Sequence, residues 1–193
     1  MILQATISEG DDALQWDSYH AHDLEVWGPL EGLPRRQARS IYDRMMKEKD
    51  ERTAELGALL AANGISLTPG DEGIQQLNQW YADGLESDTG NQDELSAGWL
   101  SVTSDIAWFL GDTIIDRISI LHWEFFTFGK RNVEYQHPVV MGFVNINPKY
   151  SINFHRRLRH YGTRIVRRHA AESDQFIRWL EEISELVPGS QDN

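Results

Sequence analysis

The chain has 193 residues, of which 40% are hydrophobic and 25% charged, and its formal net charge is -12. This length and composition predict one globular domain with its own core and argue against a disordered chain. There are no cysteines, which excludes structural disulfides, thiolate metal sites and cysteine nucleophiles. The start, MILQATISEGDD, lacks the basic and apolar regions of a signal peptide, and no apolar run is long enough for a bilayer. We therefore expect a cytoplasmic protein without membrane partners.

Helices dominate the first half of the predicted structure. A short strand is expected over residues 2–7, and Asp11 or Asp12 can cap a helix that carries apolar residues up to Trp27. Apolar residues then return at helical spacing, which predicts three further helices. They span about residues 34–63, 74–85 and 94–117.

The pattern changes at residue 118. ISILHWEFF (118–126) and NVEYQHPVVMGFV (132–144) alternate with a period of two, which predicts a β-hairpin. Pro138 cannot donate to a ladder, so its strand should be an edge or be bulged there. A helical pattern with a break near residues 170–173 then runs to about Leu186.

These elements predict a single domain of the α+β class, mostly helical, with helices packed on a small antiparallel sheet. Its parts are a helical region over about 10–117, the hairpin over about 118–145, a second helical region over about 150–186 and a frayed tail over 187–193.

Positive charge is concentrated late in the chain. Residues 129–170 hold nine Lys or Arg and one acid, a net charge of +8, so the rest of the chain carries -20. On a helical wheel, NFHRRLRHYGTRIVRRHA (153–170) forms an amphipathic helix with a basic outer face. Its apolar stripe consists of Phe154, Leu158, Tyr161 and Ile165. Gly162 lies in mid-helix, where glycine is unfavourable, and so predicts that another group approaches the backbone closely.

Three interpretations of the basic face remain open. It could pair with acids of the same chain, and Asp105, Asp112 and Asp116 share one face of the helix over 94–117. It could dock an acidic protein, or it could bind nucleic acid. The absence of interleaved lysines and a pI of 4.9 argue against nucleic acid. The residues expected to bind an acidic protein partner are Arg156, Arg159, His160, Arg164, Arg167, Lys130 and Arg131.

One histidine set could carry chemistry. If His122 lies opposite His137 in the hairpin, these two and Glu124 could converge on a divalent metal with open positions, as in a metal-dependent hydrolase. The alternative is that they are half-buried polar residues of a covered sheet. His155, His160 and His169 are spaced by five and nine residues, which builds no site on one helix. The three aspartates could also act as acid and base, although such stripes are usually solvated or paired.

No P-loop, nucleophile elbow, dinucleotide fingerprint or H-E-x-x-H motif is present. We therefore expect no cofactor and favour a non-enzymatic role, with the oligomeric state left open.

Three segments carry a resemblance: GIQQLNQWYADGL (73–85), SDIAWFLGDTIIDR (104–117) and LHWEFFTFGKRNVEYQHPVVMGF (121–143). Over about residues 35–185 the chain resembles a group of small, uncharacterised bacterial proteins that have helices, an aromatic hairpin and a C-terminal helix. The order of elements is also similar to that of immunity-type proteins of bacterial toxin systems, which act by binding. The resemblance implies a bacterial binding protein and no catalytic residues.

Overall fold

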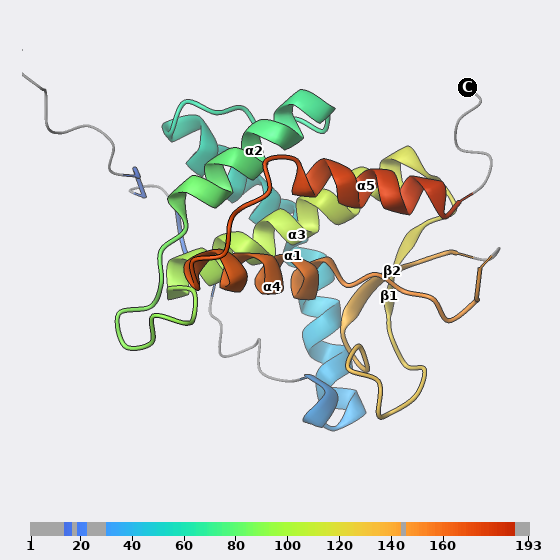
Figure 1. Cartoon of the computed structure of the whole chain (residues 1–193). Coiled ribbons are helices and arrows are strands. Elements are labelled where there is room, and N and C mark those ends of the chain that lie inside the picture. Colours follow the sequence, from blue (N-terminus) through green and yellow to red (C-terminus); the bar gives the residue numbers. More distant parts are fainter. Residues whose placement is uncertain (1–13, 17–18, 23–29, 144–145, 188–193) are drawn as a thin grey trace, which may run out of the picture.

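The computed structural model describes residues 14–16, 19–22, 30–143 and 146–187, and it confirms a mostly helical α+β chain (Figure 1). Its elements are the 3-10 helix η2 (Leu30–Gly32), α1 (Arg35–Ala62), α2 (Asp71–Gly84), α3 (Ala97–Arg117), β1 (His122–Phe125), β2 (Pro138–Met141), α4 (Phe154–Val166) and α5 (Gln175–Glu185). Within the described part, no helix has the length and apolar character needed to cross a membrane.

The predicted N-terminal elements have a mixed outcome. The strand over residues 2–7 lies outside the described residues, as does much of the helix expected after Asp11 or Asp12. The described residues 14–16 and 19–22 are not helical, so that prediction is wrong there. Side-chain contacts hold this stretch instead, because Trp16 packs edge-on against Trp99 with ring centroids 5.4 Å apart.

Helix α3 lies at the centre of the molecule (Figure 1). The apolar stripe that its sequence predicts is buried. All the residues from Ser101 to Gly111 are buried as well, including those outside the stripe. Three helices, α1, α4 and α5, pack against it. A helix covered on several sides needs small and apolar residues all round. The single apolar stripe therefore predicted only part of the buried surface of α3.

The hairpin is shorter than its sequence pattern suggests. β1 and β2 are four residues each, and the antiparallel register places His122 opposite Met141 and Phe125 opposite Pro138. Residues 127–137 form turns instead of strand, and Gln136 has a left-handed backbone with φ of 69°. β2 begins at Pro138, where the missing N–H costs no ladder bond, and on its other side Val140 exchanges two backbone hydrogen bonds with Ile152.

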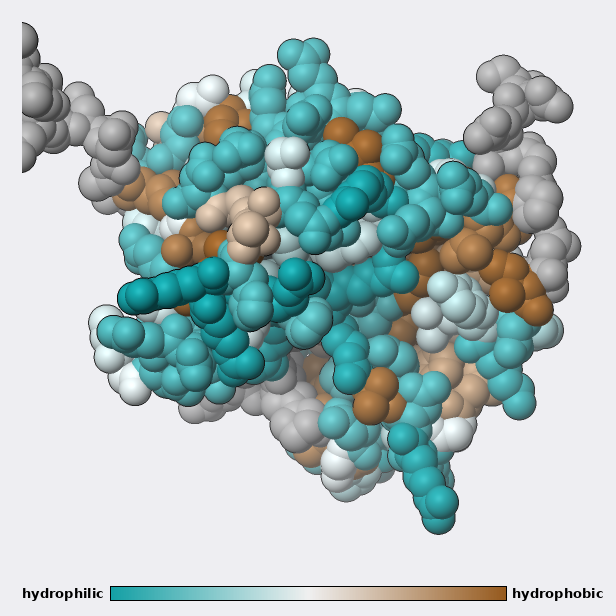
Figure 2. Space-filling model, viewed as in Figure 1, coloured by the Kyte–Doolittle hydropathy of each residue, from teal (hydrophilic) through white to brown (hydrophobic). Residues whose placement is uncertain are grey.

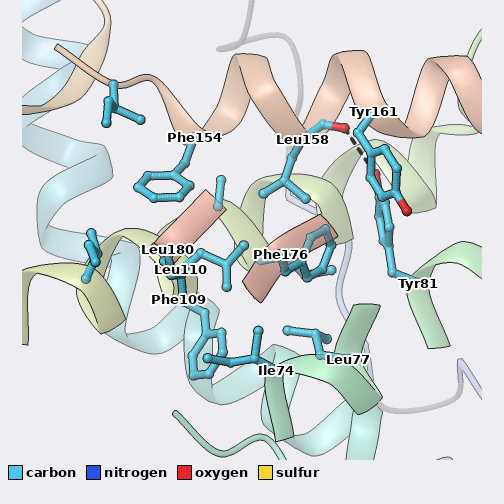
Figure 3. Close-up of a cluster of buried hydrophobic side chains, with 14 of the residues drawn as sticks. Ile74, Leu77, Tyr81, Phe109, Leu110, Phe154, Leu158, Tyr161, Phe176 and Leu180 are labelled. Carbon is cyan, nitrogen blue, oxygen red and sulfur yellow. Dashed lines mark hydrogen bonds between the residues drawn. The ribbon is translucent and has the colours of Figure 1, made fainter. Parts of the chain in front are cut away.

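Helices α4 and α5 close the core. Figure 3 shows Phe154, Leu158 and Tyr161 of α4 pointing toward the side chains of α3 and α5. The expected break between the two C-terminal helices is confirmed and spans residues 167–174. A Cβ built on Gly162 would lie 2.4 Å from the hydroxyl of Tyr81, so the close approach that this glycine predicted is also confirmed.

Candidate functional site

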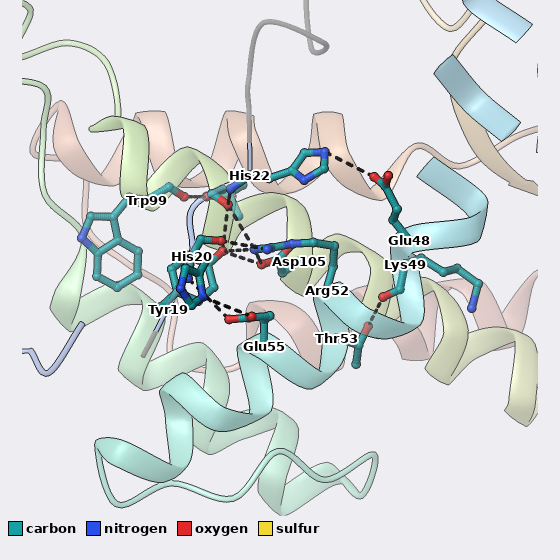
Figure 4. Close-up of polar contacts among 12 residues, drawn as sticks. Tyr19, His20, His22, Glu48, Lys49, Arg52, Thr53, Glu55, Trp99 and Asp105 are labelled. Atoms are coloured by element: carbon teal, nitrogen blue, oxygen red, sulfur yellow. Dashed lines mark hydrogen bonds and ion pairs between the residues drawn. The ribbon is translucent and has the colours of Figure 1, made fainter. Parts of the chain in front are cut away.

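The aspartates of α3 are the candidate ion-pair partners of the basic face of α4 within the chain. Asp105 is only 1% exposed, and its carboxylate accepts hydrogen bonds from Nε and Nη2 of Arg52 at 3.0 and 2.5 Å (Figure 4). The hydroxyl of Tyr19 also donates to Asp105. Burial raises the pKa of Asp105, and Arg52 opposes that rise. Asp105 is therefore held by α1, not by α4.

Asp112 is engaged in a similar way. Lys49 of α1 lies 2.7 Å from its carboxylate, and the indole Nε1 of Trp123 donates to it at 2.8 Å. Asp116 is exposed and forms no ion pair with any described residue. Of the three interpretations of the basic face, pairing within the chain does not involve these aspartates, because α1 crosses the acidic side of α3 and supplies the cations there.

The α4 surface, by which we mean the outward-facing cations of residues 156–168, is partly paired with other acids. Arg156 lies 3.5 Å from Glu134, and Arg167 lies 4.0 Å from Asp93. Exposed pairs at such distances contribute little stability, with a typical value of about 0–1 kcal/mol. A competing anion can therefore displace them at low cost.

Other cations of the α4 surface have no such partner. Among the described residues, no acid forms an ion pair with Arg159, His160, Arg164 or Arg168, and all four are exposed. Figure 2 shows the most hydrophilic side chains gathered over α4. Lys130 and Arg131 are also exposed, in the loop between β1 and β2.

The end of α4 has an unusual residue at its turn. The N–H of His169 bonds the carbonyl of Arg164, and the N–H of Arg168 bonds that of Ile165, which is the Schellman pattern. Arg168 occupies the left-handed position, with φ of 63°, where glycine is the usual residue. Arg168 therefore occupies a backbone conformation in which glycine would be more stable than a residue with a side chain.

A pocket of about 460 Å³ lies between α3, α4, η2 and the residues that lead into β2. Its lining includes Leu30, Met45, Ser104, Val133, His155 and Arg159. At its edge, Nε2 of His137 lies 2.8 Å from Glu31. Burial alone would raise the pKa of Glu31, but the hydrogen bond from His137, a backbone hydrogen bond and the nearby positive charge of Arg156 together lower it. Two cations expected in a docking surface, Arg156 and Arg159, also line this pocket.

His155 lies in the pocket wall, and its sequence spacing did not reveal this. Its ring packs edge-on against Trp108 with centroids 4.3 Å apart, and both ring nitrogens are shielded from solvent. Burial lowers the pKa of His155 to about 3, so the ring is neutral at physiological pH. The available signal was its spacing of seven residues from Gly162, which places both residues on one side of α4.

The candidate metal set is not assembled. His122 and Glu124 are neighbours on β1 at 3.9 Å, but the register puts His137 opposite Phe126, four residues beyond His122. His137 instead contacts Glu31. In the described residues, no group of three or more His, Asp or Glu side chains could hold a metal ion. The assumed register was wrong because turns, not strand, precede Pro138.

Comparison of the chain with protein-family models, with curated proteins and with solved structures found no match in any of the three.

Proposed function

We propose that this chain is a non-enzymatic binding protein of the bacterial cytoplasm that docks an acidic protein on the α4 surface. A protein that neutralises a toxin by covering it is the concrete form of this role. The observation that carries the proposal is that α1 supplies the partners of Asp105 and Asp112. The cations of α4 are thereby left facing outward.

The chain's net charge of -12 does not prevent this docking. At physiological ionic strength the Debye length is about 8 Å, so acids on distant faces are screened from a partner seated on α4. The cations at the contact then decide the interaction, and arginine is favoured at protein interfaces because its planar guanidinium pairs with carboxylates in a two-pronged geometry. Association should weaken as salt rises.

A paired charge reversal tests this function. Arg164→Glu/Arg167→Glu places two acids on the α4 surface, and Arg35→Glu/Arg36→Glu makes the same change in charge at exposed residues of α1. Each purified protein is used to capture partners from a lysate of the native cell at low salt, with elution by rising salt and identification by mass spectrometry. Nuclease treatment of the lysate separates protein partners from nucleic acid.

We expect the wild type and the α1 variant to retain the same acidic protein, and the α4 variant to bind it at least about tenfold more weakly, because attraction becomes repulsion. The free energy of unfolding of both variants should lie within about 0.5 kcal/mol of the wild-type value, as is usual for surface substitutions. Retention of the same partner by the α4 variant would show that docking occurs elsewhere. Loss of binding after nuclease treatment would assign the surface to nucleic acid.

A further inference from the structure

The pocket under α4 has properties that protein docking does not require. Its volume of about 460 Å³ falls within the range of small-molecule sites, which is about 300–1,000 Å³. Five separate parts of the chain line it: η2, α1, the central helix α3, the residues that lead into β2 and the start of α4. A cavity lined by several elements suits a small ligand better than it suits a flat protein contact.

The interior of the pocket is mainly apolar. Leu30 and Met45 are each 3% exposed, and Pro138 is buried. Val133 is 54% exposed and forms part of the entrance. A ligand that fills this space must therefore present an apolar body.

Among the charged side chains that line the pocket, Arg159 is a cation without an ion pair to a described acid. Arg156 lies 3.5 Å from Glu134, and the imidazole of His137 lies 2.8 Å from Glu31, so these groups have partners within the chain. His155 is neutral at physiological pH because burial lowers its pKa. A carboxylate at Arg159 supplies the missing partner, whereas a ligand with more negative charge would also lie near the carboxylates of Glu31 and Glu134. One negative charge is therefore the best match.

The wall adds a polar group in need of a partner. Ser104 is 6% exposed, and its hydroxyl has no hydrogen-bond partner among the described residues. Its neighbour Thr103 bonds back to the carbonyl of Trp99, as hydroxyls within helices commonly do, but Ser104 does not. A buried polar group without a partner is uncommon, and in a pocket wall it favours a polar ligand atom nearby.

We propose that this pocket, with Arg159 at its rim and an apolar interior, binds a small monocarboxylic acid. A phosphate dianion carries one charge too many, and an uncharged ligand leaves the guanidinium unmatched. Binding is non-covalent, with the carboxylate at Arg159 and the apolar body against Leu30 and Met45. The pocket shares Arg156 and Arg159 with the α4 surface, but Arg164 and Arg167 do not line it, so changes at different arginines can separate the two proposals.

Phenylacetate and hexanoate are the probes, with phenylacetamide and hexanamide as uncharged counterparts and inorganic phosphate as the anion without an apolar body. Titrations followed by two-dimensional amide NMR should show saturable shifts at pocket residues for both carboxylates. We expect a Kd of about 1 mM or tighter, binding of the amides at least about tenfold weaker and no response to phosphate. Absence of saturable binding, or equal binding of the amides, would overturn the proposal.

Two pairs of variants locate the site. Arg159→Gln should weaken phenylacetate binding by at least about tenfold, whereas Arg164→Gln, on the same helix but outside the pocket, should leave it unchanged. Val133→Asp should abolish binding by repulsion at the entrance, and Ile120→Asp, a comparable exposed site outside the pocket, should not. Unchanged binding in Arg159→Gln would sink the assignment.

The same carboxylate could instead belong to a residue of a docked protein. An acetylated and amidated hexaglutamate peptide represents that source, because it carries side-chain carboxylates without an apolar body. We expect the peptide to shift resonances of the α4 surface without displacing phenylacetate. Displacement of phenylacetate by the peptide would assign the pocket to the protein-docking surface and overturn a separate small-molecule site. If protein capture failed but phenylacetate still bound, only the docking proposal would be overturned.

Discussion

Two groups of arginines differ in what surrounds them. Arg52 of α1 lies at the interface with α3, where its guanidinium donates to Asp105, to the hydroxyl of Tyr19 and to the carbonyl of His20. Arg159 and Arg164 of α4 lie on the outside and pair with no described acid. The same residue type therefore holds a buried acid in one helix and faces solvent in the other.

The difference teaches how an acidic chain can present a basic surface. Acids on α3 that could have covered the α4 arginines are occupied by α1, because a buried carboxylate needs a partner that reaches it without leaving other polar groups unsatisfied. Arg52 meets this need and also bonds the segment around Tyr19. The buried carboxylate of Asp105 is paired through both oxygens, whereas Arg159 and Arg164 on the outer side of α4 pair with no described acid.

The largest expected effect is at Arg52. Arg52→Ala removes the cation and leaves Asp105 buried without its charged partner, so we expect the free energy of unfolding to fall by about 3–5 kcal/mol. Urea unfolding followed by tryptophan fluorescence measures the loss. The double variant Arg52→Met/Asp105→Leu should recover most of it, because both charges are gone. A loss below about 1 kcal/mol would show that Asp105 does not depend on Arg52.

A pH-dependent effect is expected at His155. Its pKa of about 3 in the folded chain lies below the value of about 6.5 of an unfolded chain. Between these values the unfolded state binds more protons, so stability is fully present above about pH 6.5 and is lost as pH falls toward 3. Between pH 7 and pH 5 the loss due to His155 should be about 2 kcal/mol.

Urea unfolding at several pH values tests the His155 effect. His155→Gln should flatten the dependence between pH 7 and pH 5, and His160→Gln, at an exposed position on the same helix, should leave it as in the wild type. Both variants keep every carboxyl group of the chain, so a difference between their slopes reports the substituted histidine. If both variants kept the wild-type slope, His155 would be titrating with an ordinary pKa.

An effect of similar or smaller size is expected where α2 meets α4. Gly162→Ala places a methyl group 2.4 Å from the hydroxyl of Tyr81, so overpacking should cost about 1–3 kcal/mol although alanine is the better helix former. Tyr81→Phe removes that hydroxyl, so the double variant should lose less than the sum of the single losses. Strict additivity in urea unfolding would show that the two residues do not contact each other.

The sequence predicted best those features that depend on near neighbours. Helical spacing located α1 to α5, the wheel of α4 separated its buried stripe from its cations, and Gly162 marked a close approach. It failed where distant parts meet. Arg52 and Asp105 are 53 residues apart, and no spacing rule joins them. The pocket was also hidden, because its walls come from separate elements, and the spacing of His155 from the other histidines of α4 indicated no site.

The smallest expected effect has the opposite sign and separates stability from binding in one residue. Arg168 sits in the left-handed position at the end of α4, a conformation that costs a residue with a Cβ about 1 kcal/mol relative to glycine. Arg168→Gly should therefore raise the free energy of unfolding by about 0.5–1 kcal/mol, and Arg164→Gly, inside the helix, should lower it by about 1 kcal/mol. If the α4 surface docks an acidic partner, both variants should bind it more weakly because each loses one cation. A more stable Arg168→Gly variant that binds more weakly would show that the charge of Arg168 strengthens association at the expense of stability. A more stable variant with unchanged binding would remove Arg168 from the docking surface.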